Sequence, residues 1–330
     1  MKILVLTNTE HYNFGKHPRG WTALPYFFTK LGNKVLALGK YDQPLFYWHY
    51  LKFKPDIIVS AWVPAGFVPA FFNKIGLISC PVVHAWDDYY AEQMTNYPHW
   101  LVSFLEKFTI KNSDFITTIS KYNLSLAKKI GKPGVYIPNG VEKKYSKSSI
   151  KLSDLKTNKK NISVLYLGDQ SPYKKVDVLV KAVNGIDADL FLLGNKNPDL
   201  EKIAGKNVHF IGPAKPEEVQ SILKQADVLA NASDQDSSFK FFEYIAAKKP
   251  ILAYDGRPSY ILTHKKDAYL TKDFKSAIIE LGKNKKLRKK LTENVSKIKL
   301  YNWEEITKNY LRILEYVRDR KYQKAEDIKF

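Results

Sequence analysis

The sequence predicts an α/β protein built from two Rossmann-like domains, each a parallel sheet with helices on both faces. Short apolar segments alternate with stretches of helical periodicity, which is typical of buried parallel strands joined by helices. This alternation stops at a lysine- and serine-rich stretch, residues 143–161, and then begins again. The length of 330 residues also suits two domains of about 150 residues each.

The expected strands of the first half are short apolar runs at 3–6, 34–38, 57–60, 81–84, 116–119 and 134–137. Apolar residues recur with a helical period at 21–31, 64–73, 100–112 and 121–130. The second half continues with strands at 163–167, 189–193, 208–211, 228–230 and 251–254, and with an amphipathic helix at 304–320. The predicted organisation is therefore a domain at 1–145, a linker at 146–161, a domain at 162–303 and a C-terminal segment at 304–330.

The chain carries a formal net charge of +20, mostly from lysine. Residues 143–160 hold seven lysines against one acidic residue, and residues 265–300 hold twelve basic residues against four acidic ones. Phosphorylated substrates, an anionic lipid surface or nucleic acid would complement this charge. The sequence has no zinc-ligand spacing, helix-turn-helix pattern or arginine–aromatic interleaving, so no specific nucleic-acid partner is expected. For the segment 283–291, a solvated lysine face and attraction to a membrane surface both remain open.

Cys80 is the single cysteine, so no internal disulfide can form, which fits a reducing cytosol. Its apolar neighbours favour a small buried side chain over a reactive thiol. The sequence contains no run of 18 apolar residues, and its first ten residues lack a signal-peptide cleavage pattern. We therefore expect a cytoplasmic protein, either free or peripheral on the inner face of the cell membrane.

The stretch 227–250 combines a short apolar strand, a polar turn and a helix. Ser237 and Ser238 suit the N-cap of that helix, where a hydroxyl satisfies free backbone N–H groups. A strand that leads into a helix N-terminus forms an anion site, and Lys240 adds a positive charge to it. Glu243, three residues later, could hold the two hydroxyls of a ribose. These groups suit a nucleoside diphosphate, although an ordinary strand–helix unit of a parallel sheet has the same pattern.

The segment SSFKFFEYIAAKKPILAYD, residues 237–255, resembles the donor-site signature of retaining GT-B glycosyltransferases of the family-4 type. That family commonly has two glutamates with seven residues between them. The second falls on Glu243, whereas the first falls on Gln235, which can hydrogen-bond sugar hydroxyls but carries no charge. Asp234 or Asp236 could replace the missing carboxylate. The resemblance also implies that Phe239, together with the serines and the lysine before Glu243, contacts the substrate.

The loop after the first strand of the second domain resembles the family's glycine–arginine–lysine loop, which clamps the diphosphate. Gly168 and Lys174 match the family's glycine and lysine, but Asp169 stands at the arginine position. The clamp therefore lacks one cation, and Lys175 or Lys240 could compensate. A solvated turn is the alternative interpretation of this loop.

Three further loops resemble family motifs at the ends of strands. Gly194 follows the second strand of the second domain, as does the glycine beneath the family's nucleotide. Asn139 lies in an Ile-Pro-Asn-Gly-Val segment that matches a family motif near the end of the first domain, although Pro-Asn-Gly is also a common turn. In the first loop of the chain, Gly15 and Arg19 are the expected equivalents of a glycine-rich loop that closes on donor and acceptor.

His84 ends a predicted strand, and Asp87 and Asp88 follow it in a polar, aromatic loop. The resemblance implies that His84 contacts the transferred sugar and that the two aspartates position the acceptor. A histidine at a strand end is otherwise more often structural. The family's C-terminal helix crosses back onto the first domain, so the helix at 304–320 is expected to do the same.

Residues 44–54 combine bulky aromatic side chains with lysines, the composition of a helix at a membrane interface. The alternative is a helix that packs its rings, such as those of Phe46 and Trp48, onto the sheet. If the membrane interpretation holds, a lipid-linked acceptor is expected.

These observations predict a GT-B glycosyltransferase, with two domains facing a central cleft. It would move a sugar from a nucleotide-diphosphate donor to an acceptor hydroxyl, with retention of configuration. We expect no metal, because the sequence shows no metal-ligand cluster and the resemblance implies an enzyme that works without one. No cofactor is expected either, and the nucleotide sugar is a co-substrate. The expected partners are the nucleotide sugar, a glycan or lipid-linked acceptor, and an anionic membrane surface. Catalysis is assigned to His84, Lys174, Gln235 and Glu243. Two alternatives stay open, namely a catalytically degenerate GT-B binding subunit and a polyanion-binding protein.

Overall fold

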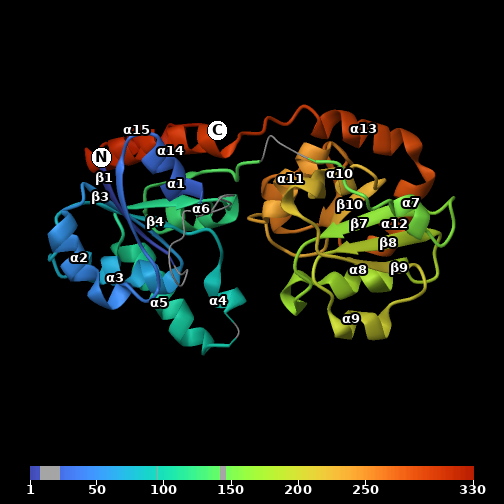
Figure 1. Cartoon of the computed structure of the whole chain (residues 1–330), viewed down its shortest axis with the longest axis horizontal. Helices are drawn as coiled ribbons and strands as arrows, with labels where there is room; N and C mark the ends of the chain where they lie inside the picture. Colours follow the sequence, from blue (N-terminus) through green and yellow to red (C-terminus); the bar gives the residue numbers. More distant parts are fainter. Residues whose placement is uncertain (8–22, 95, 142–145) are drawn as a thin grey trace. The chain divides into compact units, whose positions relative to one another are not determined.

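The computed structural model of the chain describes residues 1–7, 23–94, 96–141 and 146–330. The chain divides into two compact units, Met1–Gly140 with Tyr301–Phe330, and Val141–Leu300. Each unit contains a six-stranded sheet in which every pair of neighbouring strands is parallel. The predicted α/β fold with two Rossmann-like units is therefore confirmed (Figure 1).

The first sheet has the strand order β2-β1-β3-β4-β5-β6. Its strands are β1 (Lys2–Leu6), β2 (Lys34–Leu38), β3 (Ile57–Ala61), β4 (Val82–Ala85), β5 (Phe115–Thr118) and β6 (Gly134–Tyr136). Every residue of β3, β4 and β5 is buried, as expected for parallel strands that helices cover on both faces. This explains why these strands are continuous apolar runs rather than alternating patterns.

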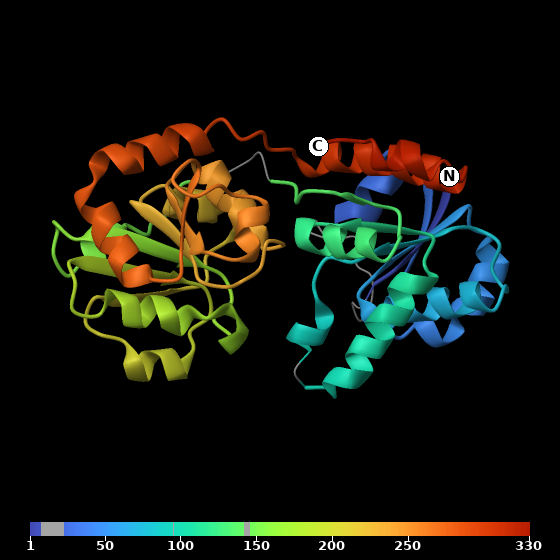
Figure 2. The same ribbon diagram turned by 180° about the vertical axis from the view of Figure 1, so that it is seen from behind.

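Helices cover both faces of the first sheet. They are α1 (Ala23–Lys30), α2 (Phe46–Phe53), α3 (Val63–Lys74), α4 (Tyr90–Gln93), α5 (His99–Asn112), α6 (Lys121–Lys129), α14 (Trp303–Arg318) and α15 (Tyr322–Glu326). Helices α1 and α14 lie on one face, whereas α2, α3 and α5 lie on the other (Figure 1). Both ends of the chain lie on this unit (Figure 2).

The C-terminal segment is joined to the first unit by buried contacts. Helix α14 begins at a capping box formed by Asn302 and Glu305, which satisfies two backbone N–H groups. The Tyr310 hydroxyl lies 2.8 Å from Thr117 Oγ1, and Gly134 N donates to Glu326 Oε1 at 3.1 Å. These bonds hold the last two helices against strands β5 and β6 of the first sheet.

The second sheet has the strand order β12-β11-β10-β7-β8-β9. Its strands are β7 (Ile162–Leu167), β8 (Ala188–Leu193), β9 (Val208–Gly212), β10 (Val228–Asn231), β11 (Ile251–Tyr254) and β12 (Ala268–Thr271). The chain moves outward from β7 to β9, returns to the other side of β7 and moves outward again. The switch point of this Rossmann order therefore lies between β7 and β10, where ligands of open parallel sheets bind.

The helices of the second unit are α7 (Leu152–Leu155), α8 (Val176–Val183), α9 (Pro198–Ile203), α10 (Val219–Leu223), α11 (Phe239–Ala247), α12 (Phe274–Lys283) and α13 (Lys285–Val295). Helices α8, α9 and α12 contribute to the core on one face of the sheet, whereas α10 and α11 contribute to the core on the other. The lysines of α13 are exposed while its Leu291 and Val295 are buried, so this basic segment is an amphipathic helix with a lysine face. No helix among the described residues is long and apolar enough to cross a bilayer.

The stretch 146–161, expected as a linker, packs on the second unit. Ser148 N donates to Ser221 Oγ at 2.8 Å, and Leu152 N donates to Gln225 Oε1 at 2.9 Å. Its turn of helix α7 buries Leu152 in the core beside α10 and α11. The boundaries between the two units accordingly fall after residues 140 and 300.

Helix α2 contains most of the aromatic stretch that composition associates with membrane interfaces. Phe46 is only 1% exposed, and the Tyr47 ring stacks on Phe72 with centroids 5.0 Å apart. Trp48 and Leu51 point outward instead, with 53% and 52% exposure. The packing alternative is therefore right for Phe46 and Tyr47, and the helix offers only part of its aromatic surface to solvent.

Cys80 is partly buried and packs against the core beneath the first sheet. Burial raises the pKa of its thiol to about 12, so the side chain stays a neutral thiol. This agrees with the expected structural role.

Candidate functional site

The candidate site lies at the switch point of the second sheet, where three loops meet at the carboxyl ends of β7, β8 and β10. The predicted residues of the second unit all fall in these loops or in the first turns of α11. They are Gly168, Lys174, Gly194, Asp234, Gln235, Asp236, Ser237, Ser238, Phe239, Lys240 and Glu243.

Two glycines bring the ends of β7 and β8 into close backbone contact. Gly168 and Gly194 have φ angles of +115° and +153°, which side-chain-bearing residues rarely adopt. A Cβ atom at Gly194 would lie 2.2 Å from the Gly168 carbonyl oxygen. Only glycine fits this contact, which keeps side chains away from the edge where a ligand would approach.

Lys174 connects the β7 loop to the β10 loop. It ends a short 3-10 turn, Pro172–Lys174, and its Nζ donates to Gln235 Oε1 at 2.8 Å. The two residues that the family resemblance places at the phosphate clamp and at the first glutamate position therefore touch. The neighbouring Lys175 is exposed, with its Nζ 5.3 Å from the centroid of the Tyr254 ring.

Lys240 is the most unusual charged group of the site. It lies in the first turn of α11, is 7% exposed, and its Nζ has no hydrogen-bond partner among the described residues. The Nζ lies 3.9 Å from the centroid of the Tyr166 ring, a cation–π contact. Burial, and then the nearby Lys174, hold the pKa of Lys240 well below its usual value, against the opposing effects of Asp169 and Glu243. An anion at this point would give Lys240 Nζ the hydrogen-bond acceptor that the described residues do not provide.

Two buried tyrosines hydrogen-bond to the backbone of the strands and loop around Lys240. The Tyr244 hydroxyl accepts from Leu167 N and donates to the Ala230 carbonyl, both at 3.0 Å, so it joins the ends of β7 and β10. The Tyr166 hydroxyl donates to the Asp169 carbonyl at 2.5 Å. Sequence reasoning did not assign these tyrosines, although a tyrosine directly after Glu243 in the matched motif was a usable signal.

The N-terminus of α11 is not capped in the expected way. Ser238 occupies the N-cap position, but its side chain makes no capping hydrogen bond. The expectation that this hydroxyl satisfies the first amides is therefore wrong. The helix dipole favours negative charge at this N-terminus whichever side chain caps it.

The acidic residues beside Gln235 have structural contacts. Asp234 Oδ1 accepts from Arg257 N at 2.6 Å, and a Cβ atom at Gly256 would lie 2.4 Å from the same oxygen. Asp236 is 3% exposed. Asp234 thus holds the loop after β11, and Gln235 is the member of this group that contacts Lys174.

Glu243 lies on α11, one turn after Lys240, and is partly buried. Its backbone carbonyl accepts from Gln220 Nε2 at 2.9 Å, which ties α11 to α10. The carboxylate acts on the pKa of Lys240, so the two side chains are electrostatic neighbours.

In the first unit, His84 is completely buried on β4. Its Nδ1 lies 3.1 Å from Ser60 Oγ, while its Nε2 has no partner among the described residues. A Cβ atom at Gly66 of α3 would lie 2.6 Å from the imidazole, so this glycine makes room for the ring. Burial lowers the pKa of His84 to about 3, and the ring is neutral at physiological pH. Contact with a sugar stays a prediction, because the ring does not reach the surface in this structure.

The loop after β4 is held by a buried carboxylate that sequence reasoning missed. Glu106 of α5 accepts from Trp86 Nε1 at 2.8 Å and from Tyr90 N at 2.9 Å. Asp87, 8% exposed, and the partly exposed Asp88 lie on this anchored loop. Burial raises the pKa of Glu106, and these hydrogen bonds oppose the effect.

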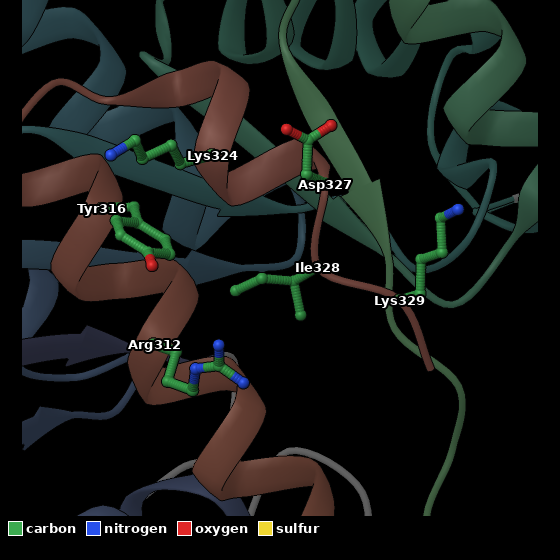
Figure 3. Close-up of a pocket in the computed structure, with 6 residues that line it drawn as sticks. All are labelled: Arg312, Tyr316, Lys324, Asp327, Ile328 and Lys329. Carbon is green, nitrogen blue, oxygen red and sulfur yellow. The ribbon is translucent and has the colours of Figure 1, made fainter.

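The remaining predicted residues of the first unit have different settings. Asn139 is buried, with 5% exposure, and the next residue, Gly140, lies so close to Trp303 that a Cβ atom would be 2.7 Å from the indole ring. Gly15 and Arg19 lie outside the described residues. A groove of about 340 Å³ in the same unit, lined by Arg312, Tyr316, Lys324, Asp327, Ile328 and Lys329, contains none of the predicted residues (Figure 3).

The described residues contain no group of histidine, cysteine or carboxylate side chains that could hold a metal ion. The chemistry that the switch-point site offers is thus that of two lysines, helix amides, an amide side chain and a carboxylate. This set can bind a phosphorylated ligand and hydrogen-bond hydroxyl groups.

The chain is similar to known glycosyltransferases. Residues 161–284, which include all three loops, match the family model described as Glycosyl transferases group 1. An uncharacterized glycosyltransferase of Methanocaldococcus jannaschii is 26% identical over 290 residues, covering 80% of this chain and 76% of that protein.

Solved structures share the fold at low identity. HepE of Anabaena in complex with UDP-glucose matches with a TM-score of 0.71 and 14% identity, covering 96% of this chain and 99% of that one. Sucrose-phosphate synthase of Thermosynechococcus elongatus matches with a TM-score of 0.78 and 14% identity, covering 97% and 99%. Residues 161–284 are thus similar to the group 1 glycosyltransferases, and the two Rossmann-like units share the fold of the solved structures named above.

Proposed function

We propose that this protein is a glycosyltransferase that moves a sugar from a nucleotide-diphosphate donor to an acceptor hydroxyl, and that the switch-point site of the second unit binds the donor. The observation that carries this proposal is the buried Lys240 ammonium, which has no hydrogen-bond partner among the described residues. Burying a cation without a hydrogen-bond acceptor is costly, unless a bound ligand supplies that acceptor. The diphosphate of a nucleotide sugar would supply it.

Lys174, Lys240 and the first amides of α11 would together hold the diphosphate. Asp169 stands where the family has an arginine, and Lys240 approaches from the other side of the switch point, over the Tyr166 ring. A hypothetical Cβ atom at Gly168 would lie 3.7 Å from the Lys240 Nζ, so this cation sits directly beside the β7 loop. We infer that Lys240 supplies the positive charge that the arginine of the diphosphate-clamping loop supplies in the glycosyltransferases that this chain resembles.

The other two groups would orient the nucleoside and the sugar. Glu243 would accept hydrogen bonds from ribose hydroxyls. Gln235 already accepts from Lys174 through Oε1, which leaves its Nε2 as a donor for a sugar hydroxyl. In this arrangement Lys174 would touch both the leaving phosphate and the residue that positions the sugar.

The proposed reaction breaks the bond between the anomeric carbon and the diphosphate oxygen and forms one to the acceptor oxygen. Negative charge develops on the diphosphate as it leaves, and the two lysines and the helix amides would stabilise it. As the family resemblance implies, the departing phosphate would take the acceptor proton on the same face of the sugar, giving retention of configuration. The nucleotide sugar is then a co-substrate, and we propose that no metal or further cofactor takes part.

The solved neighbour that contains UDP-glucose supports a UDP-sugar as the donor to test first. We further propose that the acceptor is a glycan or a lipid-linked saccharide and that the protein works in the cytoplasm, peripheral to the inner face of the cell membrane. The net charge of +20 supports attraction to an anionic surface.

Asp169 and Gln235 also favour a second candidate, a degenerate GT-B subunit that binds a nucleotide sugar without turnover. One screen tests both. Ligand at a hundredfold excess over its Kd should stabilise the protein by about 2.7 kcal/mol, which a thermal-shift assay with nucleotide sugars detects. A shift together with released nucleoside diphosphate supports the transferase. A thermal shift without release of nucleoside diphosphate, whichever acceptor is added, supports the binding subunit. If no nucleotide or nucleotide sugar shifts the melting temperature, both candidate functions are contradicted.

A further inference from the structure

Helices α3 and α5 pack against each other beneath the first sheet (Figure 1). Aromatic rings from the two helices form a continuous line. Phe71 contacts Phe67 with centroids 6.2 Å apart, Phe67 contacts Phe108 at 5.1 Å, and Phe108 contacts Phe104 at 6.1 Å. Trp100 lies one turn before Phe104. Phe71, Phe104 and Trp100 are 42%, 57% and 71% exposed, so the line opens to solvent at both ends. We call these five residues the α3–α5 ridge.

Lysines continue the same line. On α5, Trp100, Phe104, Lys107 and Lys111 are spaced by four, three and four residues, which places them on one stripe of the helix, and all four are exposed. Lys74 is exposed at the end of α3. No ion pair joins these three lysines to another described residue.

Neither helix of the ridge exposes an acidic side chain. Helix α3 contains none, and the single acid of α5, Glu106, is 2% exposed because it anchors the loop after β4. On these two helices the large apolar rings are therefore accompanied by exposed lysines and by no exposed carboxylate. Trp and Phe beside lysines, without acids, are the composition of helices that lie in a membrane interface.

We propose that the α3–α5 ridge is the surface through which this protein rests on an anionic lipid bilayer. The rings would enter the boundary between headgroups and acyl chains, and the lysines would contact anionic headgroups. A second copy of the chain fits less well, because each copy carries a net charge of +20 and repels the other. The proposal deepens the peripheral-membrane part of the proposed function. It places the contact on α3 and α5 because their rings form a continuous line, whereas α2 exposes Trp48 and Leu51 but buries Phe46.

Sedimentation with phosphatidylcholine vesicles and with mixed phosphatidylcholine–phosphatidylglycerol vesicles, at low and high salt, tests the apolar part. Trp100→Ser with Phe104→Ser should lower the partition coefficient on mixed vesicles by about tenfold or more and abolish the part of the binding that survives high salt. The matched control is Leu155→Ser with Ile203→Ser, two apolar residues of the second unit that are 44% and 38% exposed. It should change the partition coefficient by less than about twofold.

Charge is tested with two triple substitutions to glutamine that change the net charge equally. The ridge variant replaces Lys74, Lys107 and Lys111, and the control replaces the exposed Lys285, Lys286 and Lys290 of α13. A lysine at an anionic surface is worth about fivefold in partition, so the ridge variant should lose on the order of a hundredfold and the control much less.

Three results would overturn the proposal. The first is failure of the wild type to bind mixed vesicles at low salt. The second is a larger loss in the α13 control than in the ridge variant. The third is a concentration-dependent dimer that the Trp100→Ser, Phe104→Ser variant abolishes, which would make the ridge an interface between two copies. Circular dichroism confirms that the variants fold. No nucleotide sugar enters the assay, so failure here leaves the donor-site proposal intact.

Discussion

Replacing Lys240 with methionine should strengthen the fold and weaken nucleotide binding. The ammonium is 7% exposed and has no hydrogen-bond partner among the described residues. An unsatisfied buried polar group costs about 1–3 kcal/mol, and methionine has a similar length and packs well against an aromatic ring such as that of Tyr166. The free energy of unfolding should therefore rise by about 1–2 kcal/mol, because part of the cost is already offset by the cation–π contact.

Affinity for UDP should change in the opposite direction. A hydrogen bond from an ammonium to a phosphate oxygen contributes about 1.5–3 kcal/mol, so Lys240→Met should raise the Kd for UDP by about 10- to 150-fold. Titration calorimetry measures this, and urea unfolding measures the stability. Lys248→Met is the matched control, because it removes an exposed lysine at the far end of the same helix. It should change neither quantity by more than about 0.5 kcal/mol.

The pH dependence follows from the low pKa of Lys240 in the free protein. A bound phosphate raises that pKa, so binding takes up a proton wherever the free lysine is partly neutral. Affinity for UDP should then fall as pH rises, and Lys240→Met should lose this dependence. A variant that is less stable than wild type but binds UDP normally would refute the reasoning, because Lys240 would then be a structural residue.

The remaining predictions concern four other positions. Lys174→Ala should lower turnover by about a hundredfold, whereas the exposed neighbour Lys175→Ala should lower it by less than threefold; equal effects would move the clamp elsewhere. Glu243→Ala should weaken nucleotide-sugar binding by about 1–3 kcal/mol in calorimetry, and an unchanged Kd in the folded variant removes it from the site. Gly194→Ala should destabilise the protein by more than about 1 kcal/mol in urea unfolding, since its Cβ would lie 2.2 Å from a carbonyl oxygen. Because burial lowers the pKa of His84 from 6.5 to about 3, the unfolded chain binds an extra proton between these values. Stability should therefore fall by about 2 kcal/mol from pH 7 to pH 5, and His84→Asn should be less pH-dependent by that amount.

The fold could be predicted from the sequence because parallel strands buried on both faces are visible as apolar runs. The expected strands at 57–60 and 228–230 each lie within one residue of the observed β3 and β10. Ligands of open parallel sheets bind at the carboxyl ends of the strands, so the loops that follow the strands could be assigned as site candidates from the sequence. The order of the strands, and with it the switch point, is known only from the structure.

Side-chain contacts within the site were less predictable. The hydrogen bond between Lys174 and Gln235 joins residues 61 positions apart, and no local pattern indicates it. The sequence pattern assigned Lys240 to the anion site, but it did not indicate that this lysine is buried, because only three-dimensional packing decides that. Ser238 has the residue type of a cap but not the geometry. Composition was also a poor guide to the surface, since Phe46 is core while Trp100, outside the aromatic stretch, is 71% exposed.

The most direct test of the central claim is a crystal structure of the protein with UDP. Diphosphate oxygens should lie about 2.7–2.9 Å from Lys240 Nζ and from Lys174 Nζ and should also contact the first amides of α11. The ribose hydroxyls should lie within hydrogen-bond distance of Glu243. UDP bound away from the switch point of the second sheet, or bound there while Lys240 keeps its place over Tyr166 with no phosphate contact, would contradict the account.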